Sequence, residues 1–298
     1  MHKSGFVNIV GRPNVGKSTL MNALVGERMS IITSKPQTTR HRIIGILSGE
    51  DFQIVFSDTP GIIKNPAYKM QRAMNNFVEG SFDDADIVLF VTEPYEKYAA
   101  DDPIFAKLKK VECPKFLIIN KIDIVHPLIL EAYKEELLKH ITVNEIFEIA
   151  ALKHQNTEGV LAGIQKYLQE GPAYYPKDQL TDRPERFFTT EIIREKILLN
   201  YREEIPYSCE VVIDGFKETQ TNSGEELARI SATIYVSREN QKVILIGKNG
   251  TSIKKLGTDA RKDLEIFLNA KVFLELSVKV RDNWRDDERV LKQFGYLQ

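Results

Sequence analysis

The sequence predicts two domains, an α/β domain with a mixed, mostly parallel sheet and then a smaller α+β domain. The chain has 298 residues, more than one domain usually holds. From residue 6 to about residue 168, short apolar runs alternate with helix-like segments, which is typical of a mostly parallel sheet flanked by helices. Residues 171–184 carry three prolines in fourteen positions, as linkers do. We therefore expect domains at 1–172 and 187–298, joined by a linker at 173–186.

The apolar runs of the first domain predict its strands, and the segments between them predict its helices. The runs are FVNIV, FQIVFSD, DIVLFV, KFLIIN and EIFEIA, and the helix-like segments are TLMNALVG, 101–111, 128–140 and 156–169. The second domain is expected to contain helices at 189–204 and 258–269 and strands in SCEVVIDGF, LARISATIYVS and KVFLELSVKV. KVILI, residues 242–246, is compatible with a buried strand or a buried helical turn.

The composition is that of an ordinary globular protein. Apolar residues make up 42% of the chain, and 41 basic residues against 42 acidic ones give a net charge of -1, so a basic binding surface has to be local. Cys113 and Cys209 are expected to be buried thiols in a reducing compartment. The longest apolar runs fall far short of the roughly 18 residues that span a bilayer, so we expect a cytoplasmic protein and leave peripheral membrane contact open.

The stretch GRPNVGKS, residues 11–18, matches the P-loop pattern G-x-x-x-x-G-K-[ST] between a predicted strand and a predicted helix. Gly11 and Gly16 let backbone N–H groups curl around phosphate oxygens. Lys17 adds a positive charge at the outer phosphates, and Ser18 offers a hydroxyl to Mg²⁺. The loop thus predicts a nucleoside triphosphate site, without choosing between ATP and GTP.

Two further motifs select guanine nucleotides. DTPG places Asp58 at a strand end, where it can hold Mg²⁺ through water, and Gly61 where its N–H can reach a γ-phosphate. NKID places Asp123 after another strand, and its carboxylate can accept hydrogen bonds from N1–H and the 2-amino group of guanine, a donor pair that adenine lacks. We expect Asn120 to brace the neighbouring loops and Lys121 to cover the base.

The three motifs in this order resemble the GTPases of the translation-factor class. The resemblance implies that a switch I threonine in SKPQTTRHR, either Thr39 or Thr38, closes on Mg²⁺ and the γ-phosphate. Ile62 stands where Ras-like enzymes have a water-orienting glutamine. The resemblance is therefore to hydrophobic-substituted GTPases, in which an asparagine matching Asn14 helps to hold K⁺.

The last guanine-contacting element of this class usually begins with serine, but Ala150 stands at that position. The backbone N–H of Ala151 or Leu152 is expected to meet the guanine carbonyl, with somewhat weaker nucleotide retention. The resemblance implies catalytic roles for Asn14, Lys17, Thr39 and Gly61 and Mg²⁺ contacts from Ser18, Thr39 and Asp58. The expected GTP-binding residues are Gly11, Arg12, Pro13, Asn14, Val15, Gly16, Lys17, Ser18, Thr19, Asp58, Thr59, Pro60, Gly61, Ile62, Asn120, Lys121, Ile122, Asp123, Ala150, Ala151 and Leu152.

A second glycine loop, residues 247–250, lacks the P-loop spacing but matches G-x-x-G, by which KH domains clamp single-stranded nucleic acid. Residues 242–262 hold six basic side chains against one acidic one, an excess of +5, whereas residues 181–298 hold 20 of each sign. On its own the four-residue loop favours a turn between helices with a solvated lysine face, and only its setting favours nucleic-acid binding. The expected RNA-binding residues are Gly247, Lys248, Asn249, Gly250, Lys254 and Lys255.

Over nearly its whole length the chain resembles the Era family of bacterial GTPases, which has these motifs, linker and C-terminal stretch in the same order. The resemblance implies a six-stranded P-loop GTPase domain and then a type II KH domain, in which KVILI is a short helix. It implies slow GTP hydrolysis with Mg²⁺ and K⁺. It also implies binding to the 3′ end of 16S rRNA and to the small ribosomal subunit by a monomer, with peripheral contact to the inner membrane. A metabolic P-loop enzyme and a GTP-stabilised RNA-binding or membrane-associated scaffold are the alternatives.

Overall fold

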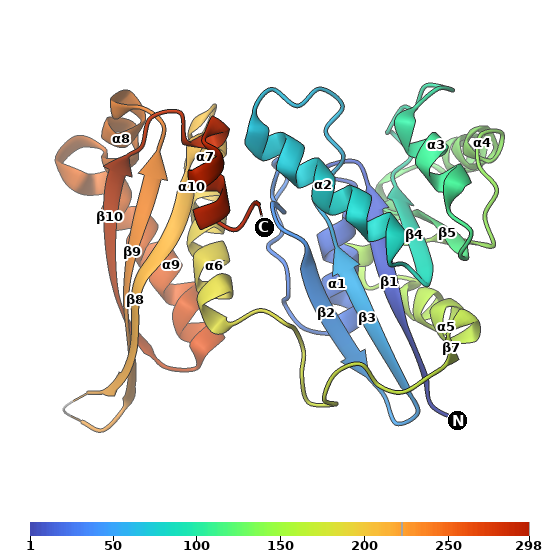
Figure 1. The fold of residues 1–298 in the computed structure, drawn as a ribbon, viewed down its shortest axis with the longest axis horizontal. Helices are drawn as coiled ribbons and strands as arrows, with labels where there is room; N and C mark the ends of the chain where they lie inside the picture. Colours follow the sequence, from blue (N-terminus) through green and yellow to red (C-terminus); the bar gives the residue numbers. More distant parts are fainter. Residues whose placement is uncertain (222, 298) are drawn as a thin grey trace. The chain divides into compact units, whose positions relative to one another are not determined.

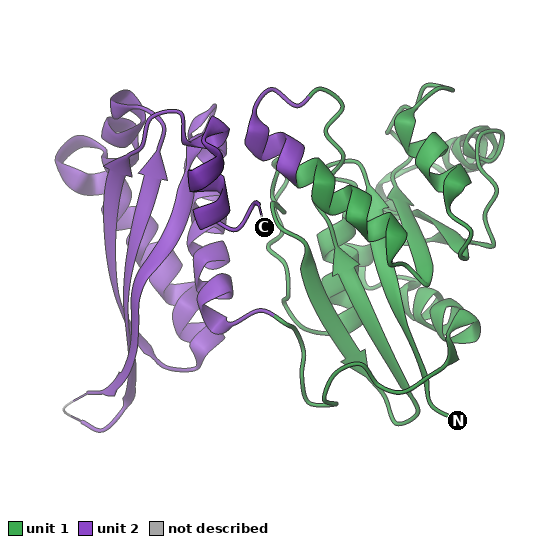
Figure 2. Ribbon diagram, viewed as in Figure 1, with its two compact units in different colours: residues 1–65, 74–182 green, residues 66–73, 183–298 purple. Residues whose placement is uncertain are grey.

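The structure is a computed structural model that describes residues 1–221 and 223–297 (Figure 1). The chain forms two compact units, residues 1–65 with 74–182 and residues 66–73 with 183–298 (Figure 2). Each unit contains its own sheet and its own buried core. The domain limits expected from the sequence stay a prediction.

Unit 1 is built on one mixed sheet. Within the described ranges its strands follow the order β2-β3-β1-β4-β5-β6, and β7 pairs with the start of β1. Pairing is parallel except between β2 and β3 and between β7 and β1. The strands are β1 (Lys3–Gly11), β2 (Ile43–Ser48), β3 (Phe52–Asp58), β4 (Ile87–Thr92), β5 (Lys115–Ile119), β6 (Glu145–Glu148) and β7 (Gln169–Glu170). The prediction of a mostly parallel sheet is confirmed, and β7 adds to the six expected strands.

Helices cover both faces of this sheet. Val10, Val88 and Phe90 pack with α3 and α4 in one buried cluster. Because successive strand residues point to opposite faces, Ile9 and Leu89 face the other side, where α1 contacts α5. The elements are α1 (Lys17–Val25), α2 (Lys69–Asp83), α3 (Pro103–Lys110), α4 (Pro127–Leu138), α5 (Thr157–Tyr167) and the 3₁₀ turns η1 (Ile122–Ile124) and η2 (Ala151–Lys153).

The functional motifs gather at one edge of the sheet because each follows the carboxyl end of a strand. The P-loop leaves β1, the DTPG motif leaves β3, the NKID motif leaves β5, and residues 150–152 leave β6. β1, β3, β4, β5 and β6 run in parallel, so their carboxyl ends meet at a common edge, where open α/β sheets bind their ligands.

Much of the segment expected as a linker is docked on β2 and β3. The buried side chain of Gln53 accepts hydrogen bonds from the amides of Tyr174 and Tyr175 at 2.7 and 2.9 Å. The carbonyl of Leu180 accepts the amide of Ile46 at 2.8 Å. Residues up to 182 therefore belong to unit 1 by their contacts.

Unit 2 contains a sheet of the order β10-β9-β8 within the described residues. β9 pairs antiparallel with β8 and parallel with β10. The strands are β8 (Glu210–Gln220), β9 (Glu226–Val236) and β10 (Lys271–Val280). The helical elements are α6 (Glu185–Asn200), α7 (Ile205–Ser208), α8 (Glu239–Ile246), η3 (Lys248–Gly250), α9 (Thr251–Leu268), η4 (Trp284–Asp286) and α10 (Glu288–Gln293). This α+β arrangement was expected.

The core of unit 2 explains why α9 starts earlier than residue 258. Leu256, Ala260 and Leu264 are fully buried at a spacing of four, so they form one face of a helix that packs against α6 and β10. KVILI ends α8, and its Leu245 is buried in the same core, which confirms the short helix. The G-x-x-G loop is therefore a tight connection between two helices.

No helix in the described part of the chain combines the length and the apolar character needed to cross a membrane.

Candidate functional site

A cavity of about 530 Å³ lies at the carboxyl edge of the sheet of unit 1. This volume is within the range of roughly 300–1,000 Å³ usual for small-molecule sites. Of the residues expected to bind GTP or Mg²⁺, the cavity is lined by Pro13, Asn14, Gly16, Lys17, Ser18, Thr19, Thr39, Gly61, Asn120, Lys121, Asp123, Ala150, Ala151 and Leu152. Residues from five separate segments of the chain thus line one cavity.

Several expected residues do not line the cavity, among them Gly11, Val15, Asp58, Thr59, Pro60, Ile62 and Ile122. Asp58 and Thr59 are fully buried, and the Thr59 hydroxyl donates to the carbonyl of Ile9 at 2.9 Å. Ser34, Gln37 and Thr38, from the expected switch I segment, also line the cavity. Motif matching missed the remaining lining residues, Ile31, Ile32, Thr33 and Ile124, whose only sequence signal is that they adjoin the switch I segment or the NKID motif.

At two positions of the P-loop, neighbouring atoms lie so close to the backbone that there is room only for glycine. A Cβ on Gly11 would lie 2.2 Å from the carbonyl oxygen of Val91, and one on Gly16 would lie 2.1 Å from Nδ2 of Asn120. Gly16 also has a φ of 97°, in the left-handed region that favours glycine. Any larger residue at these positions would displace the loop.

Lys17 lies at the base of the cavity. Its ammonium donates to the carbonyl of Arg12 at 2.8 Å. Burial disfavours the charged form and lowers the pKa of Lys17 to about 8, although the charge of Asp58 acts in the opposite direction. A triphosphate bound in the cavity would place negative charge beside this buried ammonium and so stabilise its charged form.

Ser18, Thr39 and Asp58 form one polar cluster. The Ser18 hydroxyl donates to Oδ2 of Asp58 at 2.6 Å and lies 2.9 Å from the Thr39 hydroxyl, which itself lies 3.3 Å from the same Oδ2. Thr38 points elsewhere, because its hydroxyl donates to the carbonyl of Lys35 at 2.6 Å. Of the two switch I candidates, Thr39 lies with the other expected ligands.

This cluster suits a magnesium ion. Hydroxyl and carboxylate oxygens are the hard ligands that Mg²⁺ prefers. Within the described residues, Oδ1 of Asp58 is buried and lacks a hydrogen-bond partner, so a metal-bound water would satisfy it. Burial raises the pKa of Asp58, and the nearby Lys17, Ser18 and Thr39 act in the opposite direction. A divalent cation would likewise favour the carboxylate form.

Asn120 braces two loops, as expected. Its Nδ2 donates to the carbonyl of Val15 at 2.9 Å, and its Oδ1 accepts the amide of Ala151 at 3.0 Å. Lys121 donates to the carbonyl of Asn14 at 2.7 Å and forms an ion pair with Glu93. The P-loop, the NKID segment and the loop after β6 are thereby held as one frame.

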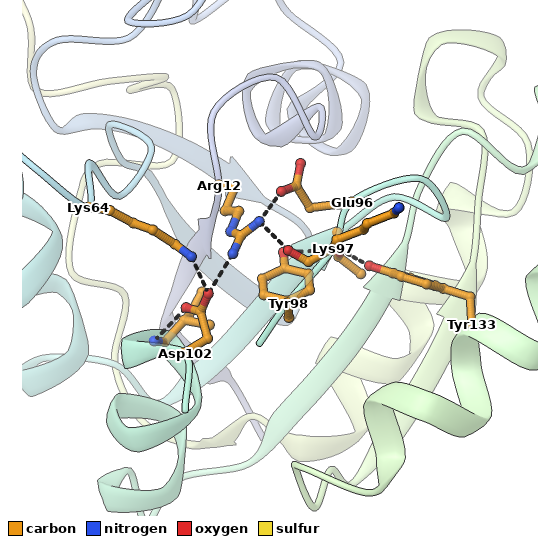
Figure 3. A network of polar contacts seen from close by, with 9 residues as sticks. Arg12, Lys64, Glu96, Lys97, Tyr98, Asp102 and Tyr133 are labelled. Atoms are coloured by element: carbon orange, nitrogen blue, oxygen red, sulfur yellow. Dashed lines mark hydrogen bonds and ion pairs between the residues drawn. The ribbon is translucent and has the colours of Figure 1, made fainter. Parts of the chain in front are cut away.

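The side chain of Arg12, in the P-loop, does not line the cavity and binds residues outside it. Its guanidinium lies 4.2 Å from the ring centroid of Tyr98 and forms ion pairs with Glu96 and Asp102 (Figure 3). Lys64 reaches the same carboxylate oxygen of Asp102 at 2.9 Å. This network lies beside the P-loop and links it to the β4–α3 connection and to the segment after Gly61.

In unit 2, the G-x-x-G loop has the backbone that its glycines predict. Gly247 and Gly250 have φ values of 74° and 75°, and Asn249 between them has a φ of 53°. A Cβ on Gly247 would lie 2.2 Å from Oγ of Ser252, whereas the space around Gly250 is open. The loop runs directly into the first turn of α9, whose backbone N–H groups can donate hydrogen bonds to an anion.

A groove of about 350 Å³ lies between α9, the helix that follows this loop, and β10, and residues 247–250 do not line it. Its lining residues are Ile253, Lys254, Gly257, Thr258, Arg261, Val272, Phe273, Leu274 and Leu276. Lys254 is the expected RNA-binding residue among them. Lys248, Asn249 and Lys255 are exposed outside the lining. Phe273 is 47% exposed, with the Arg229 guanidinium 5.4 Å from its ring centroid, so an aromatic face is available for stacking on a base.

Parts of the chain match two protein families. Residues 6–121 match the family described as 50S ribosome-binding GTPase, and residues 204–285 match the KH domain family. Two curated relatives are both named GTPase Era. That of Syntrophus aciditrophicus (strain SB) is 47% identical over 297 residues, 99% of this chain and 96% of the relative. That of Staphylococcus haemolyticus (strain JCSC1435) is 44% identical over 298 residues, 100% of this chain and 98% of the relative.

Two solved structures resemble the whole chain. One is a crystal structure of Era in complex with MgGDPNP and nucleotides 1506–1542 of 16S ribosomal RNA, with 38% identity, a TM-score of 0.93 and 100% of both chains covered. The other is a crystal structure of an Aquifex aeolicus Era variant bound to GDP.AlF4-, with 38% identity, a TM-score of 0.92 and 99% of this chain and 100% of that chain covered. The similarity therefore extends over both units.

Proposed function

The chain belongs to the Era family of GTPases, and on that premise we propose that it acts in small ribosomal subunit biogenesis, with its nucleotide state controlling its hold on the 3′ end of 16S rRNA. The observation that carries this proposal is the presence of two candidate sites in one chain. One is the cavity lined by Lys17 and Asp123, and the other is the G-x-x-G loop with the groove between α9 and β10. The similar structure that holds MgGDPNP and nucleotides 1506–1542 of 16S rRNA supports the pairing of these ligands.

GTP is hydrolysed when water attacks the γ-phosphorus and GDP leaves. Backbone N–H groups of the P-loop and the Lys17 ammonium bind the β- and γ-phosphates, where negative charge builds up in the transition state. Gly61 lines the cavity and offers its N–H to the γ-phosphate side. Asp123 accepts the guanine donors and so selects the base.

Mg²⁺ would be held by Ser18 and Thr39, with Asp58 contacting it through water. When bound, the ion neutralises charge on the β- and γ-phosphates. The short contacts among these three side chains support the assignment. Their role in the protein is to fix the ligand set and to close the switch I segment over the phosphates.

Ile62 cannot orient the attacking water, because its side chain neither donates nor accepts a hydrogen bond. We therefore propose slow intrinsic hydrolysis that K⁺ accelerates through Asn14. Asn14 is exposed at the cavity, and its amide donates to the carbonyl of Ser34 at 2.8 Å, which brings oxygen atoms of the P-loop and switch I together. Equal rates in K⁺ and Na⁺ buffers would remove this part of the proposal.

The 3′ end of 16S rRNA would bind along the groove of unit 2. Gly247 and Gly250 let the main chain approach the sugar-phosphate strand, and Lys248, Lys254 and Lys255 meet its phosphates. Phe273 would stack on a base. A monomer, a cytoplasmic location and peripheral contact with the inner membrane stay predictions. Because the chain belongs to the Era family, the alternative of a metabolic P-loop enzyme is excluded.

The testing experiment measures binding of an RNA with the 3′-terminal sequence of 16S rRNA to the full chain in its GTP-analogue and GDP states. We expect tighter binding with the analogue by about tenfold, the size of an ordinary allosteric coupling. Lys17→Ala should abolish this difference in RNA affinity and leave the RNA affinity of the GDP state unchanged. Equal affinities in both states would refute nucleotide control, and equal affinity for an unrelated RNA would refute the 16S assignment.

A further inference from the structure

Asp102 lies where two functional segments of unit 1 meet. It precedes α3 as its N-cap residue, and its Oδ1 accepts the amide of Ile104 at 3.2 Å. Its Oδ2 receives both the Arg12 guanidinium at 2.5 Å and the Lys64 ammonium at 2.9 Å. Figure 3 shows Arg12 and Lys64 converging on this one carboxylate. A P-loop residue and a residue three positions after Gly61 therefore share a single anchor.

We infer that Asp102 is a positioning residue for GTP hydrolysis, which holds the P-loop through Arg12 and the segment after Gly61 through Lys64. The inference rests on the proposed roles of Lys17 and Gly61. Asp102 does not line the cavity, so it acts through these neighbours rather than on the phosphates.

On the P-loop side, Asp102 binds the side chain of Arg12. The backbone carbonyl of Arg12 in turn accepts a hydrogen bond from the Lys17 ammonium at 2.8 Å. Three groups fix the guanidinium of Arg12: Asp102, Glu96 and the carbonyl of Lys97, which accepts at 2.6 Å. With its side chain only 15% exposed and stacked on Tyr98, Arg12 has little freedom to move. The position of Lys17 thus depends on an arginine that never meets the nucleotide.

On the other side, the anchor holds a segment that already lies against the P-loop. A Cβ on Gly61 would lie 2.5 Å from the backbone nitrogen of Pro13, and the amide of Ile62 donates to the carbonyl of Gly11 at 3.4 Å. Ile63 then hydrogen-bonds through its amide and its carbonyl to the side chain of Asn75 in α2, at 3.0 and 2.9 Å, and Lys64 binds Asp102. Residues 61 and 62 thus lie directly against the P-loop, and Lys64 connects the end of the segment to it through Asp102 and Arg12.

The two ion pairs of Asp102, with Arg12 and with Lys64, differ in how readily they break. The side chain of Lys64 is 52% exposed, and that of Asp102 is 4% exposed. Burial acts to raise the pKa of Asp102, but the hydrogen bonds from Lys64, Ile104 and Arg12 outweigh it and lower that pKa. Because an ion pair with an exposed lysine is weak, Lys64 can leave while Arg12 stays bound. The P-loop end is then a fixed support and the Lys64 end is a releasable contact.

The test compares three variants of the full-length protein by hydrolysis at saturating GTP and by affinity for fluorescent GDP. Lys64→Met should lower kcat about fivefold and leave GDP affinity within about twofold, because the ion pair is exposed and GDP lacks the phosphate that Gly61 faces. Arg12→Met should weaken GDP binding by about tenfold, because it loosens the support of Lys17. Asp102→Asn should show both losses, and Asp102→Glu should restore part of each.

The double variant Lys64→Met with Asp102→Asn should be no slower than Asp102→Asn, since both changes break the same contact. Asp101→Asn and Lys109→Met serve as matched controls, because both side chains are exposed at the ends of the same helix, Asp101 before the first residue of α3 and Lys109 in its last turn, and they should behave as the unchanged protein. Thermal unfolding of each variant identifies loss of folding, and Lys64→Met still decides the question if Asp102→Asn unfolds.

The inference is overturned if Lys64→Met hydrolyses GTP at the rate of Lys109→Met, or if the losses of the double variant multiply. It is also overturned if Lys64→Met weakens GDP binding as much as it lowers kcat. Absence of GTP hydrolysis in the unchanged protein would instead contradict the proposed function.

Discussion

The ammonium of Lys153 lies 2.9 Å from Oδ2 of Asp123, the carboxylate assigned to the guanine base. The Lys153 side chain is 61% exposed, and that of Asp123 is 18% exposed. Water screens an ion pair with so exposed a lysine, so the contact is weak. The Asp123 carboxylate would therefore remain available to accept two N–H groups from a guanine base.

Asp123→Asn should exchange the preferred base. The amide presents a donor where guanine also has one, whereas xanthine offers an oxygen there. We expect GTP affinity to fall at least about 100-fold and the xanthine nucleotide to bind better than GTP, measured by titration of both nucleotides. Lys153→Met should change GTP affinity less than about fivefold and keep the preference for guanine, because its ion pair is exposed.

Lys17 should make nucleotide binding depend on pH. Its pKa is lowered to about 8 in the free protein, and bound phosphates raise it, so binding above that pH takes up a proton. Affinity for GDP should therefore be constant well below about pH 8 and should fall above it by up to about tenfold per pH unit. Calorimetric titration between about pH 7 and 9 measures this dependence. Lys17→Met should bind weakly with a flat profile, and an equally steep profile would contradict the assignment.

Thr39 and Thr38 should differ in their effect on magnesium. Thr39→Ala removes a hydroxyl next to Ser18 and Asp58, so the Mg²⁺ concentration for half-maximal hydrolysis should rise about tenfold. Thr38→Ala removes a hydrogen bond to the Lys35 carbonyl and should leave that concentration nearly unchanged. The reverse ranking in a magnesium titration would assign the ligand to Thr38.

Asn120→Ala should loosen two loops at once. It removes a donor to the Val15 carbonyl and an acceptor for the Ala151 amide, both buried groups. Each unsatisfied group costs about 1–3 kcal/mol, so we expect GDP to dissociate at least about tenfold faster and the protein to unfold at a lower temperature. Stopped-flow release of fluorescent GDP measures the first effect. Asn76→Ala, at an exposed position of α2, is the control.

Gly247→Ala should impair RNA binding more than Gly250→Ala. Both glycines have positive φ values, and the strain of an alanine there is on the order of 1–2 kcal/mol. At Gly247 the new Cβ also meets Ser252, whereas Gly250 has open space. Filter binding of a single-stranded RNA should show the larger loss for Gly247→Ala, and nucleotide affinity should stay unchanged in both variants.

Motif spacing predicts the cavity because glycines, Lys17, Asp123 and the strand ends that carry them are local features. The direction of the Arg12 side chain is not local, since its partner Asp102 lies 90 positions further along the chain. Thr38 and Thr39 are neighbours of the same residue type, so the path of the folded loop has to choose between them. Phe273 becomes a groove residue only because β10 lies beside α9.

Some of the missed structure was present as a signal in the sequence. Met70, Ala73, Met74 and Val78 are buried, and their spacing of three and four predicts the helix α2. The polar residues between them hide this pattern from a search for apolar runs. The docked segment 173–182 carries no such signal, because its proline-rich sequence resembles that of a free linker while its backbone hydrogen-bonds to Gln53.

The pairing of β7 with β1 has a consequence for the order in which the chain is made. Ser4 pairs with Gln169, so the first strand to leave the ribosome awaits a partner synthesised about 165 residues later. At roughly 5–20 residues per second this wait lasts on the order of ten to thirty seconds. The amino end of β1 thus stays without its β7 partner until residue 170 emerges, when the segment that docks on β2 and β3 is the only part of unit 1 still to be made.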